Sequence, residues 1–268
     1  MAEKKSSQLR LRVFAGPNGS GKSTIIKTIR STQVNENQKL DVGIYINADD
    51  IAQNLKTGRF TFTPYQVGAA KDELIDFAGS QGLLFGGFSK VKFEKAFSLE
   101  GNKLKVINMD DLDRVAQIVA RFLRHALIKA KKRFSFETVF SHESNLEDMR
   151  LAAAAGYKVY LYFVGTESPE INKYRVTLRV REGGHNVPAE RIEQRYYRSL
   201  EFLYDAAEIA YQAYFFDNSV NDAPYKVAGH FKVVSGVKVW DDTLPENASF
   251  WFKKYYINKI EKPPGKEV

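Results

Sequence analysis

The sequence predicts an α/β fold of the phosphate-loop NTPase class, with a doubly wound, mainly parallel sheet of about five strands, flanking helices and an inserted β-hairpin segment. Apolar strands alternate along the chain with segments of helical periodicity. The first strand, at residues 9–15, runs directly into a glycine-rich turn and then a helix. Residues 157–164 are almost continuously apolar, which is typical of a strand buried on both faces of a parallel sheet.

The expected elements follow one another in this alternating order. Strands are expected at residues 9–15, 43–46, 133–140, 157–164 and 211–216. Helices are expected at residues 22–30, 51–55, 112–131 and 145–155, and the last of these ends at Gly156. Ligands of such sheets bind at the carboxyl ends of the strands, so functional residues are expected there.

The segment at residues 57–111 is rich in phenylalanine and interrupts the alternation. It contains a pattern typical of a β-hairpin, with strands at residues 91–99 and 104–107. We interpret the chain as a single domain, residues 1–268, in which this segment is an insertion that serves as a lid or packing flap, or alternatively shapes the substrate site. Residues 221–268 form a C-terminal extension with short strands and an aromatic tail, to which the sequence assigns no function.

The bulk composition excludes several classes of protein. The chain has no cysteine, which rules out disulfides, thiolate zinc sites and thiol nucleophiles. Its formal net charge of +8 is spread along the chain, which favours an enzyme that binds a charged nucleotide over a nucleic-acid-binding protein without deciding between them. The start lacks the apolar core of a signal peptide and no apolar stretch is long enough to span a bilayer, so a cytoplasmic protein without a membrane partner is expected.

Residues 16–23 fit the phosphate-loop pattern Gly-x-x-x-x-Gly-Lys-Ser, and they lie between an expected strand and an expected helix, as the pattern requires. Its glycines allow backbone N–H groups to surround phosphate oxygens, and the helix N-terminus adds positive potential. Lys22 would reach the β- and γ-phosphates, and Ser23 would ligate Mg²⁺, so ATP and Mg²⁺ are the expected cofactors. The residues expected to bind the nucleotide are Gly16, Pro17, Asn18, Gly19, Ser20, Gly21, Lys22, Ser23 and Thr24.

Two acidic residues at expected strands are candidates for catalysis. Asp49 follows the strand at residues 43–46, where it is placed to accept the proton of a substrate hydroxyl, as a carboxylate does in kinases. The alternative is that Asp49 or Asp50 caps the helix that follows. Glu137 lies in an otherwise apolar strand, where a charge is costly unless it has a ligand. We expect it to bind Mg²⁺ directly or through water, or else to form an internal salt bridge.

Arginines recur at helical spacing in the last third of the chain. They are Arg175 and Arg179 on one expected helix, Arg181 before a glycine-containing turn, and Arg191, Arg195 and Arg198 on the next helix. Guanidinium groups on two helices joined by such a turn suggest a lid that closes over a triphosphate. The alternative is a solvated face paired with neighbouring glutamates. Beyond the last expected parallel strand, Asp217 and Asn218 are placed to face the base of the nucleotide, or to form an Asx turn.

Taken in order, these motifs resemble those of the zeta toxin family of phosphate-loop kinases, in particular a bacterial branch labelled predicted ABC-type ATPases. The resemblance covers residues 9–220, and the matching segments are residues 16–24, Asn47-Ala48-Asp49, Phe136-Glu137-Thr138-Val139, residues 175–180, and Gly183-Gly184-His185-Asn186-Val187-Pro188 with Arg195-Tyr196. The sequence differs from the toxins in having Asn-Ala-Asp where they have an acid, a glycine and an aspartate, and in the insertion at residues 57–111.

The resemblance implies an ATP- and Mg²⁺-dependent kinase that phosphorylates a hydroxyl of a small molecule. A UDP-activated amino sugar is the acceptor that it implies, and an antitoxin protein is a partner to be expected. It also implies that Asp49 orients the substrate as a base, that Glu137 contacts the substrate, and that Arg179, Arg181 or Arg195 acts from the lid. Two alternatives stay open, a polynucleotide 5′-hydroxyl kinase, with nucleic acid the less favoured partner, and a non-catalytic ATP-binding switch.

Overall fold

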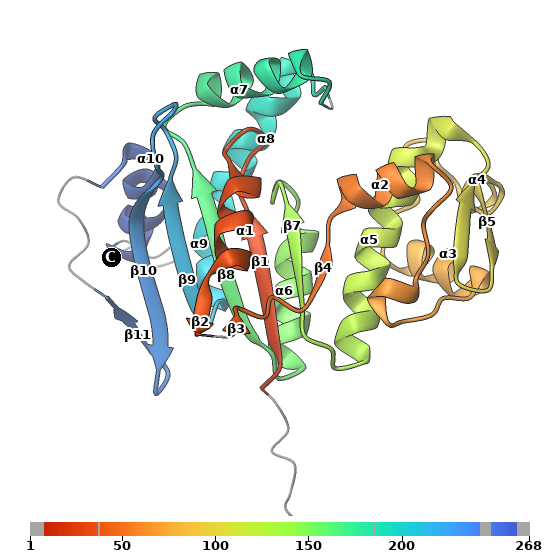
Figure 1. Cartoon of the computed structure of the whole chain (residues 1–268), viewed down its shortest axis with the longest axis horizontal. Coiled ribbons are helices and arrows are strands. Elements are labelled where there is room, and N and C mark those ends of the chain that lie inside the picture. Colours follow the sequence, from red (N-terminus) through yellow and green to blue (C-terminus); the bar gives the residue numbers. More distant parts are fainter. Residues whose placement is uncertain (1–7, 37, 185, 242–247, 262–268) are drawn as a thin grey trace, which may run out of the picture. The chain divides into compact units, whose positions relative to one another are not determined.

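A computed structural model of the chain describes residues 8–36, 38–184, 186–241 and 248–261 (Figure 1). The chain divides into two compact units. Unit 1 consists of Met1–Asp41 and Glu137–Val268, and unit 2 of Val42–Phe136. None of the helices within the described residues is long and apolar enough to cross a membrane.

The sheet strands that lie wholly within unit 1 follow one another in the order β11-β10-β9-β8-β1. Three strands, β1 (Arg10–Ala15), β8 (Lys158–Gly165) and β9 (Gln212–Asp217), are parallel to one another. Two further strands, β10 (Lys226–Val234) and β11 (Val237–Trp240), extend this sheet in the antiparallel sense. The expected mainly parallel sheet is confirmed, and the short strands of the C-terminal extension belong to it.

Helices flank this sheet on both faces, with α1 on one face and α6 and α9 on the other (Figure 1). The helices of unit 1 are α1 (Lys22–Ser31), α6 (Ser144–Ala154), α7 (Pro169–Arg181), α8 (Ala189–Glu201), α9 (Leu203–Ile209), α10 (Phe250–Phe252), the π-helical segment η3 (Lys253–Ile257) and α11 (Asn258–Glu261). Two short strands, β2 (Gln33–Asn35) and β3 (Gln38–Lys39), form a hairpin after α1. This arrangement is the doubly wound architecture that the sequence predicts.

The aromatic tail of the C-terminal extension, to which the sequence assigned no function, forms part of the core of unit 1. Trp251, Phe252 and Tyr256 are almost completely buried. The ring of Phe215 on β9 lies 4.8 Å from that of Phe252 and 4.9 Å from that of Tyr256, measured between centroids. Buried aromatic rings contribute most of the apolar area in a core of this kind. The tail therefore packs against β8 and β9, the parallel strands beside β1 and its glycine-rich turn.

Unit 2 contains a parallel strand pair and a helical cluster. Strand β4 (Ile44–Ile46) pairs with the first residues of β7 (Phe134–Thr138), so that Ile46 lies opposite Phe136. The remaining elements are α2 (Ala48–Lys56), η1 (Thr63–Tyr65), α3 (Lys71–Ser80), α4 (Lys90–Ala96), β5 (Phe97–Glu100), β6 (Lys103–Val106), η2 (Met109–Asp111) and α5 (Leu112–Lys129). Helix α5 packs against α2 and α3. Most of the phenylalanines that made the segment at residues 57–111 unusual are buried, including Phe60, Phe62, Phe88, Phe93 and Phe97.

The hairpin expected in this segment is present, but its first strand is shorter than predicted. Strands β5 and β6 are antiparallel, whereas the residues expected to begin the first strand form helix α4 instead. Ser89 caps this helix, because its side chain accepts a hydrogen bond from Lys92 N at 3.2 Å. Phe93 and Ala96, three residues apart, are the buried positions of the helix. The aromatic and β-branched residues of this stretch favour a strand. The Ser89 cap and the three-residue spacing of the buried positions favour a helix, which is what forms.

Unit 2 is wider than the insertion expected at residues 57–111, because β4, α2 and α5 belong to the same compact unit. The expectation of a single domain over residues 1–268 stays a prediction. Other expected helices are present with ends shifted by a few residues, and Gly156 follows α6 with a φ of 87° as a C-terminal glycine.

Candidate functional site

The glycine loop, residues 16–23, leads from the carboxyl end of β1 into the first turn of α1 (Figure 1). Gly16, Gly19 and Gly21 have φ angles of 143°, 75° and 94°, a region that only glycine enters at little cost. Gly21 is the N-cap residue of α1 and has the left-handed conformation. Left-handed residues of this kind build the concave backbone turns that bind anions through N–H groups.

The same glycines lie too close to other elements for a side chain to fit. A Cβ atom on Gly16 would lie 2.3 Å from a backbone oxygen of β8. One on Gly19 would lie 2.6 Å from the backbone oxygen of Asn172 on α7, and one on Gly21 would lie 2.1 Å from Nδ2 of Asn218, which follows β9. The loop is therefore held between the ends of two strands and the start of a helix.

Lys22, the first residue of α1, is buried against the loop. The residue is only 7% exposed. Its Nζ donates a hydrogen bond to the carbonyl oxygen of Pro17 at 3.0 Å. Ser23 and Thr24 come next in the first turn of α1, and both residues are exposed. Ser20 is fully buried in the loop, and its Oγ has no hydrogen-bond partner among the described residues. The ammonium and these hydroxyls surround the N-terminus of α1, where the helix dipole favours an anion.

A polar network that the sequence did not reveal ties α7 and α8 to the loop. Asn172 on α7 is fully buried, and its Nδ2 donates to the carbonyl oxygen of Asn18 at 2.5 Å. The hydroxyl of Thr166, also fully buried, donates to Oδ1 of Asn172. Tyr196 on α8 donates its hydroxyl to the Thr166 carbonyl oxygen at 2.6 Å, and burial raises the pKa of this tyrosine. The position of Thr166 directly after β8 is a signal in the sequence that could have indicated this network.

Asn218 joins the loop to the end of β9. Its side chain donates to the carbonyl oxygen of Ser20 at 2.8 Å, and its backbone N–H donates to that of Gly165 at 3.0 Å. Arg175 on α7 donates from Nη1 to the Asn218 carbonyl oxygen at 2.7 Å and from Nε to Oδ1 of Asn221 at 2.8 Å. Burial lowers the pKa of Arg175, although nearby carboxylates oppose this. Arg175 is thus an anchor of the loop after β9.

A cavity of about 420 Å³ lies beside this junction, within unit 1. Its lining combines polar groups with apolar and aromatic side chains. The lining residues are Gly21, Thr24, Tyr174, Arg175, Leu178, Asn218, Val220, Asn221, Asp222, Ala223, Pro224 and Tyr225. Asn218 lines this cavity, and its expected contact with the base of the nucleotide stays a prediction.

Asp217 adopts the alternative role that was considered for it, an Asx turn. Its Oδ1 accepts the backbone N–H of Ser219 at 2.9 Å, and its Oδ2 accepts Nε1–H of Trp251 at 2.9 Å. Burial acts to raise the pKa of this carboxyl, but hydrogen bonds from Ser219 and Trp251 outweigh it, so the pKa is lowered. Glu167, which follows β8, accepts the backbone N–H groups of Phe250 at 2.8 Å and Trp251 at 3.3 Å. The C-terminal tail is thereby fixed to the carboxyl ends of two strands.

The arginines expected to form a lid fall into two groups. Arg195 on α8 lies at the loop, where its Nη1 is 3.5 Å from Oδ1 of Asn18. Arg179 and Arg181 are exposed residues at the C-terminal end of α7. Lys173 on α7 pairs with Glu193 on α8 at 2.6 Å. Both the lid and its alternative, a solvated face of arginines paired with glutamates, stay predictions. His185, in the turn between the two helices, lies outside the described residues.

The two acidic candidates belong to different units. Glu137 is half-buried near the carboxyl end of β7. Asp49 lies in unit 2, exposed in the first turn of α2. The cap of α2 is Asn47, whose Oδ1 accepts the Asp49 backbone N–H at 2.9 Å, so the alternative that Asp49 or Asp50 is the cap is wrong. An asparagine in the extended conformation before the helix leaves the carboxylates of the first turn for other interactions.

The fold and the loop together have the architecture of the phosphate-loop class of α/β proteins. No family model matches the chain. An uncharacterized protein of Haemophilus influenzae is 31% identical over 86 residues, which is 32% of this chain and 60% of that protein. The chain therefore aligns with less than two thirds of the length of this relative.

Among solved structures, the chain is similar to one from the PezAT chromosomal toxin-antitoxin system of Streptococcus pneumoniae. The two are 14% identical with a TM-score of 0.47, and the match covers 100% of this chain and 83% of that chain. It is also similar to a chain of the AvrRxo1-ORF1:-ORF2 structure with ATP, at 12% identity and a TM-score of 0.48, over 89% of this chain and 62% of that one. A chain from the Pnkp1/Rnl/Hen1 RNA repair complex matches at 16% identity and a TM-score of 0.39, over 74% of this chain and 46% of that one.

Proposed function

We propose that the protein is an ATP-dependent kinase of the zeta toxin type, which transfers the γ-phosphate of ATP to a hydroxyl group of a small molecule. The observation that carries the proposal is the convergence of two cationic side chains on one glycine loop. Lys22 bonds to the carbonyl oxygen of Pro17 within the loop, and Arg195 approaches the same loop from a different helix. A cation delivered by a lid helix stabilises charge that develops during phosphoryl transfer, which binding alone does not require.

The residues of the loop fit a nucleoside triphosphate with Mg²⁺. Its backbone is a left-handed glycine cradle that a Cβ atom would disrupt, and Ser23 has an exposed place in the first turn of α1 beside Lys22. Ser23 would hold the ion, and Mg²⁺ would supply neutralisation of the β- and γ-phosphate oxygens. Among the described residues no group of three or more His, Cys, Asp or Glu side chains is arranged to hold a metal ion.

The cavity beside the loop is suited to the nucleoside. Its volume of about 420 Å³ lies within the usual range of small-molecule sites. Tyr174, Leu178 and Tyr225 offer apolar or aromatic contacts for a base, and Asn218 offers hydrogen bonds. Lys22 and the residues before it would then hold the phosphates at the opposite side of Gly21.

For the acceptor, we propose a UDP-activated amino sugar, with Asp49 as the base that orients its hydroxyl and Glu137 as a contact to the substrate. This part rests on the resemblance of Asn47-Ala48-Asp49 and Phe136-Glu137-Thr138-Val139 to the motifs of zeta toxins. Similarity to a chain of a toxin-antitoxin system is the reason to propose an antitoxin protein as a partner.

The test is a transfer assay with ATP labelled at the γ-phosphate, in the presence of Mg²⁺. UDP-sugars, nucleosides and 5′-hydroxyl oligonucleotides serve as separate acceptor panels, and Lys22→Ala serves as the blank. Labelled UDP-sugar is the expected product. Labelled oligonucleotide would replace the proposed acceptor with a nucleic acid, and label that stays in ATP or in free phosphate with every panel would refute the kinase.

A further inference from the structure

Unit 2 contains a second cavity, of about 330 Å³, that the nucleotide site does not use. It lies between helix α4 and the turn that leads into α5, within one compact unit. Its lining residues are Ser89, Val91, Lys92, Lys95, Ala96, Asn108 and Asp111. Three of them are charged, which is unusual for a cavity that only fills space between helices.

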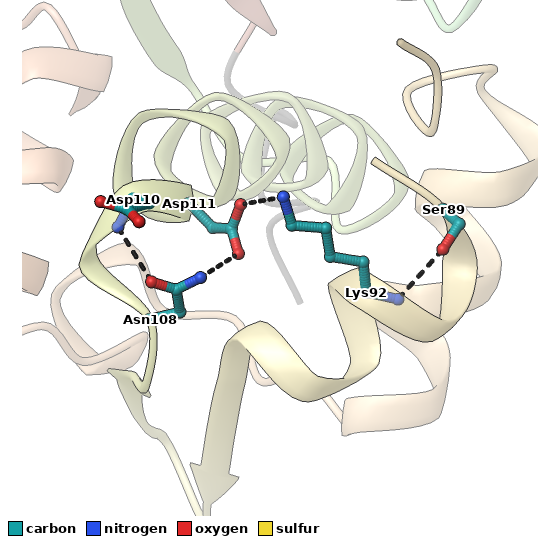
Figure 2. Close-up of polar contacts among 5 residues, drawn as sticks. All are labelled: Ser89, Lys92, Asn108, Asp110 and Asp111. Atoms are coloured by element: carbon teal, nitrogen blue, oxygen red, sulfur yellow. Dashed lines mark hydrogen bonds and ion pairs between the residues drawn. The ribbon is translucent and has the colours of Figure 1, made fainter. Parts of the chain in front are cut away.

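The buried carboxylate of Asp111 contacts Lys92 and Asn108 in this cavity (Figure 2). Asp111 is 4% exposed, and its Oδ1 lies 3.1 Å from Nζ of Lys92. Its Oδ2 accepts a hydrogen bond from Nδ2 of Asn108 at 3.0 Å. The side chain of Asn108 is fixed in turn, because its Oδ1 accepts the backbone N–H of Asp110 at 3.2 Å. Both oxygens of Asp111 are therefore occupied, and this carboxylate holds the ammonium of Lys92 in one place.

The ammonium groups exceed what Asp111 neutralises. The side chain of Lys92 is 48% exposed, and an ammonium has three donors, of which Asp111 takes one. Lys95 is one helical turn further along α4 and lines the same cavity. No ion pair or hydrogen bond involves its side chain within the described part of the chain. The side chain of Asp110, in the same turn, points away from Lys92 (Figure 2).

Exposed apolar side chains accompany the polar lining of the cavity. Val91 lines it and is 60% exposed. Ile107 and Met109, the sequence neighbours of the lining residue Asn108, are 64% and 53% exposed. An organic ligand can cover exposed apolar side chains of this kind while its polar group binds to the charged lining.

We propose that this cavity binds a small organic anion. Its oxyanion, a carboxylate or a phosphate ester, would accept hydrogen bonds from Lys92, Lys95 and the hydroxyl of Ser89, and its apolar portion would cover Val91 and Met109. Asp111 acts as the anchor that positions Lys92. The site is independent of the glycine loop, so its existence does not depend on the proposed kinase activity.

Methionine NMR tests the proposal on the full chain. Met109 is 53% exposed and directly follows the lining residue Asn108, whereas Met149 is fully buried in α6 of unit 1 and serves as an internal control. Protein labelled at the methionine methyl carbons is titrated at low salt with phenyl phosphate, benzoate and inorganic phosphate, and Met109→Leu assigns the signal. The Met109 methyl is expected to shift with saturation, and phenyl phosphate or benzoate should bind more tightly than inorganic phosphate. The tighter of the two organic probes identifies the oxyanion.

Two variants of α4 give the matched comparison. Lys95→Gln should weaken binding by about tenfold or more, because the anion loses a hydrogen bond from a charged donor. The substitution breaks no ion pair or hydrogen bond of the Lys95 side chain within the described part of the protein. Lys90→Gln, which removes a cation of the same helix that pairs with Asp76 outside the cavity, should change affinity by less than about twofold. The Met109 shift should persist in Lys22→Ala, which excludes binding at the glycine loop. An unmoved Met109 signal with all three probes, equal losses in the two variants, or inorganic phosphate binding as tightly as the organic probes would overturn the proposal.

Discussion

The indole Nε1–H of Trp251 donates a hydrogen bond to Oδ2 of Asp217 at 2.9 Å. The bond joins the C-terminal tail to the residue that precedes Asn218, whose side chain bonds to the glycine loop. The ring of Trp251 also lies where a Cβ atom on Gly165 would be, 2.5 Å from its Cε2. A segment more than two hundred residues away in the sequence thus sets the position of the loop's neighbours.

Replacing Trp251 by phenylalanine is expected to weaken ATP binding. The variant keeps an aromatic ring in the core but removes a hydrogen bond to a carboxylate, which contributes about 1.5–3 kcal/mol. Part of this loss should appear in the dissociation constant of ATP, because Asp217 and Asn218 are adjacent. Calorimetric titration with ATP measures it. Tyr256→Phe is the matched control, because the Tyr256 hydroxyl is buried without a hydrogen-bond partner among the described residues. An equal loss of affinity in both variants would contradict the link.

Lys22→Ala should abolish phosphoryl transfer while the protein stays folded. Removing a preorganised cation or donor from a site of developing charge costs about 10²–10³-fold or more in kcat. The labelled-ATP assay measures the rate, and circular dichroism verifies the fold. Lys27→Ala, an exposed lysine of the same helix, should retain the rate of the natural sequence. A rate of Lys22→Ala within a few-fold of the parent would exclude the loop from catalysis.

Arg195→Ala is expected to lower kcat by on the order of 10³-fold, with a smaller change in ATP affinity. The reason is that Arg195, one of the arginines proposed to act from a lid, lies 3.5 Å from Oδ1 of Asn18 in the glycine loop. Arg181→Ala, at the exposed end of α7, should have a much weaker effect. Steady-state kinetics at saturating ATP distinguishes the two. A larger loss in Arg181→Ala than in Arg195→Ala would show that the lid moves a different arginine into the site.

Gly21→Ala should destroy ATP binding for two separable reasons. The left-handed conformation costs a non-glycine residue about 1–2 kcal/mol, and the added Cβ atom would lie 2.1 Å from Nδ2 of Asn218. Gly156→Ala isolates the first reason, because Gly156 has a φ of 87° with nothing within 4 Å of an added Cβ atom. Thermal unfolding should show a lower melting temperature for both variants. ATP titration should show a lower ATP affinity only for Gly21→Ala. Intact binding in Gly21→Ala would mean that the loop does not hold the phosphates.

Asp49→Asn separates a kinase from a nucleotide switch. If Asp49 is the base, turnover should fall by about 10²–10⁴-fold while ATP affinity is retained. Asn47 caps α2 through its own side chain, so the substitution at position 49 leaves the cap in place. Asp50→Asn, the adjacent exposed acid, is the control. Unchanged turnover in Asp49→Asn would remove this residue from the reaction.

Much of this fold can be predicted from local sequence patterns. The apolar run that forms β8 and the glycine pattern before α1 each depend on neighbouring residues, so their elements could be predicted directly. The residues 90–96 could not, since a short aromatic segment suits either a strand or a helix until its burial is known. The loop residues were also predicted, because only glycine tolerates the backbone angles found at Gly16, Gly19 and Gly21.

The sequence by itself determined the fold class and the loop at residues 16–23, because both arise from short-range backbone conformation and apolar periodicity. Only the tertiary structure decided which side chains hold that loop. Asn172 and Asn218 bond to it across 154 and 198 residues of sequence, and Trp251 bonds to its neighbour Asp217 across 34. Such contacts depend on where three strands of one sheet end together, and no local pattern carries that information.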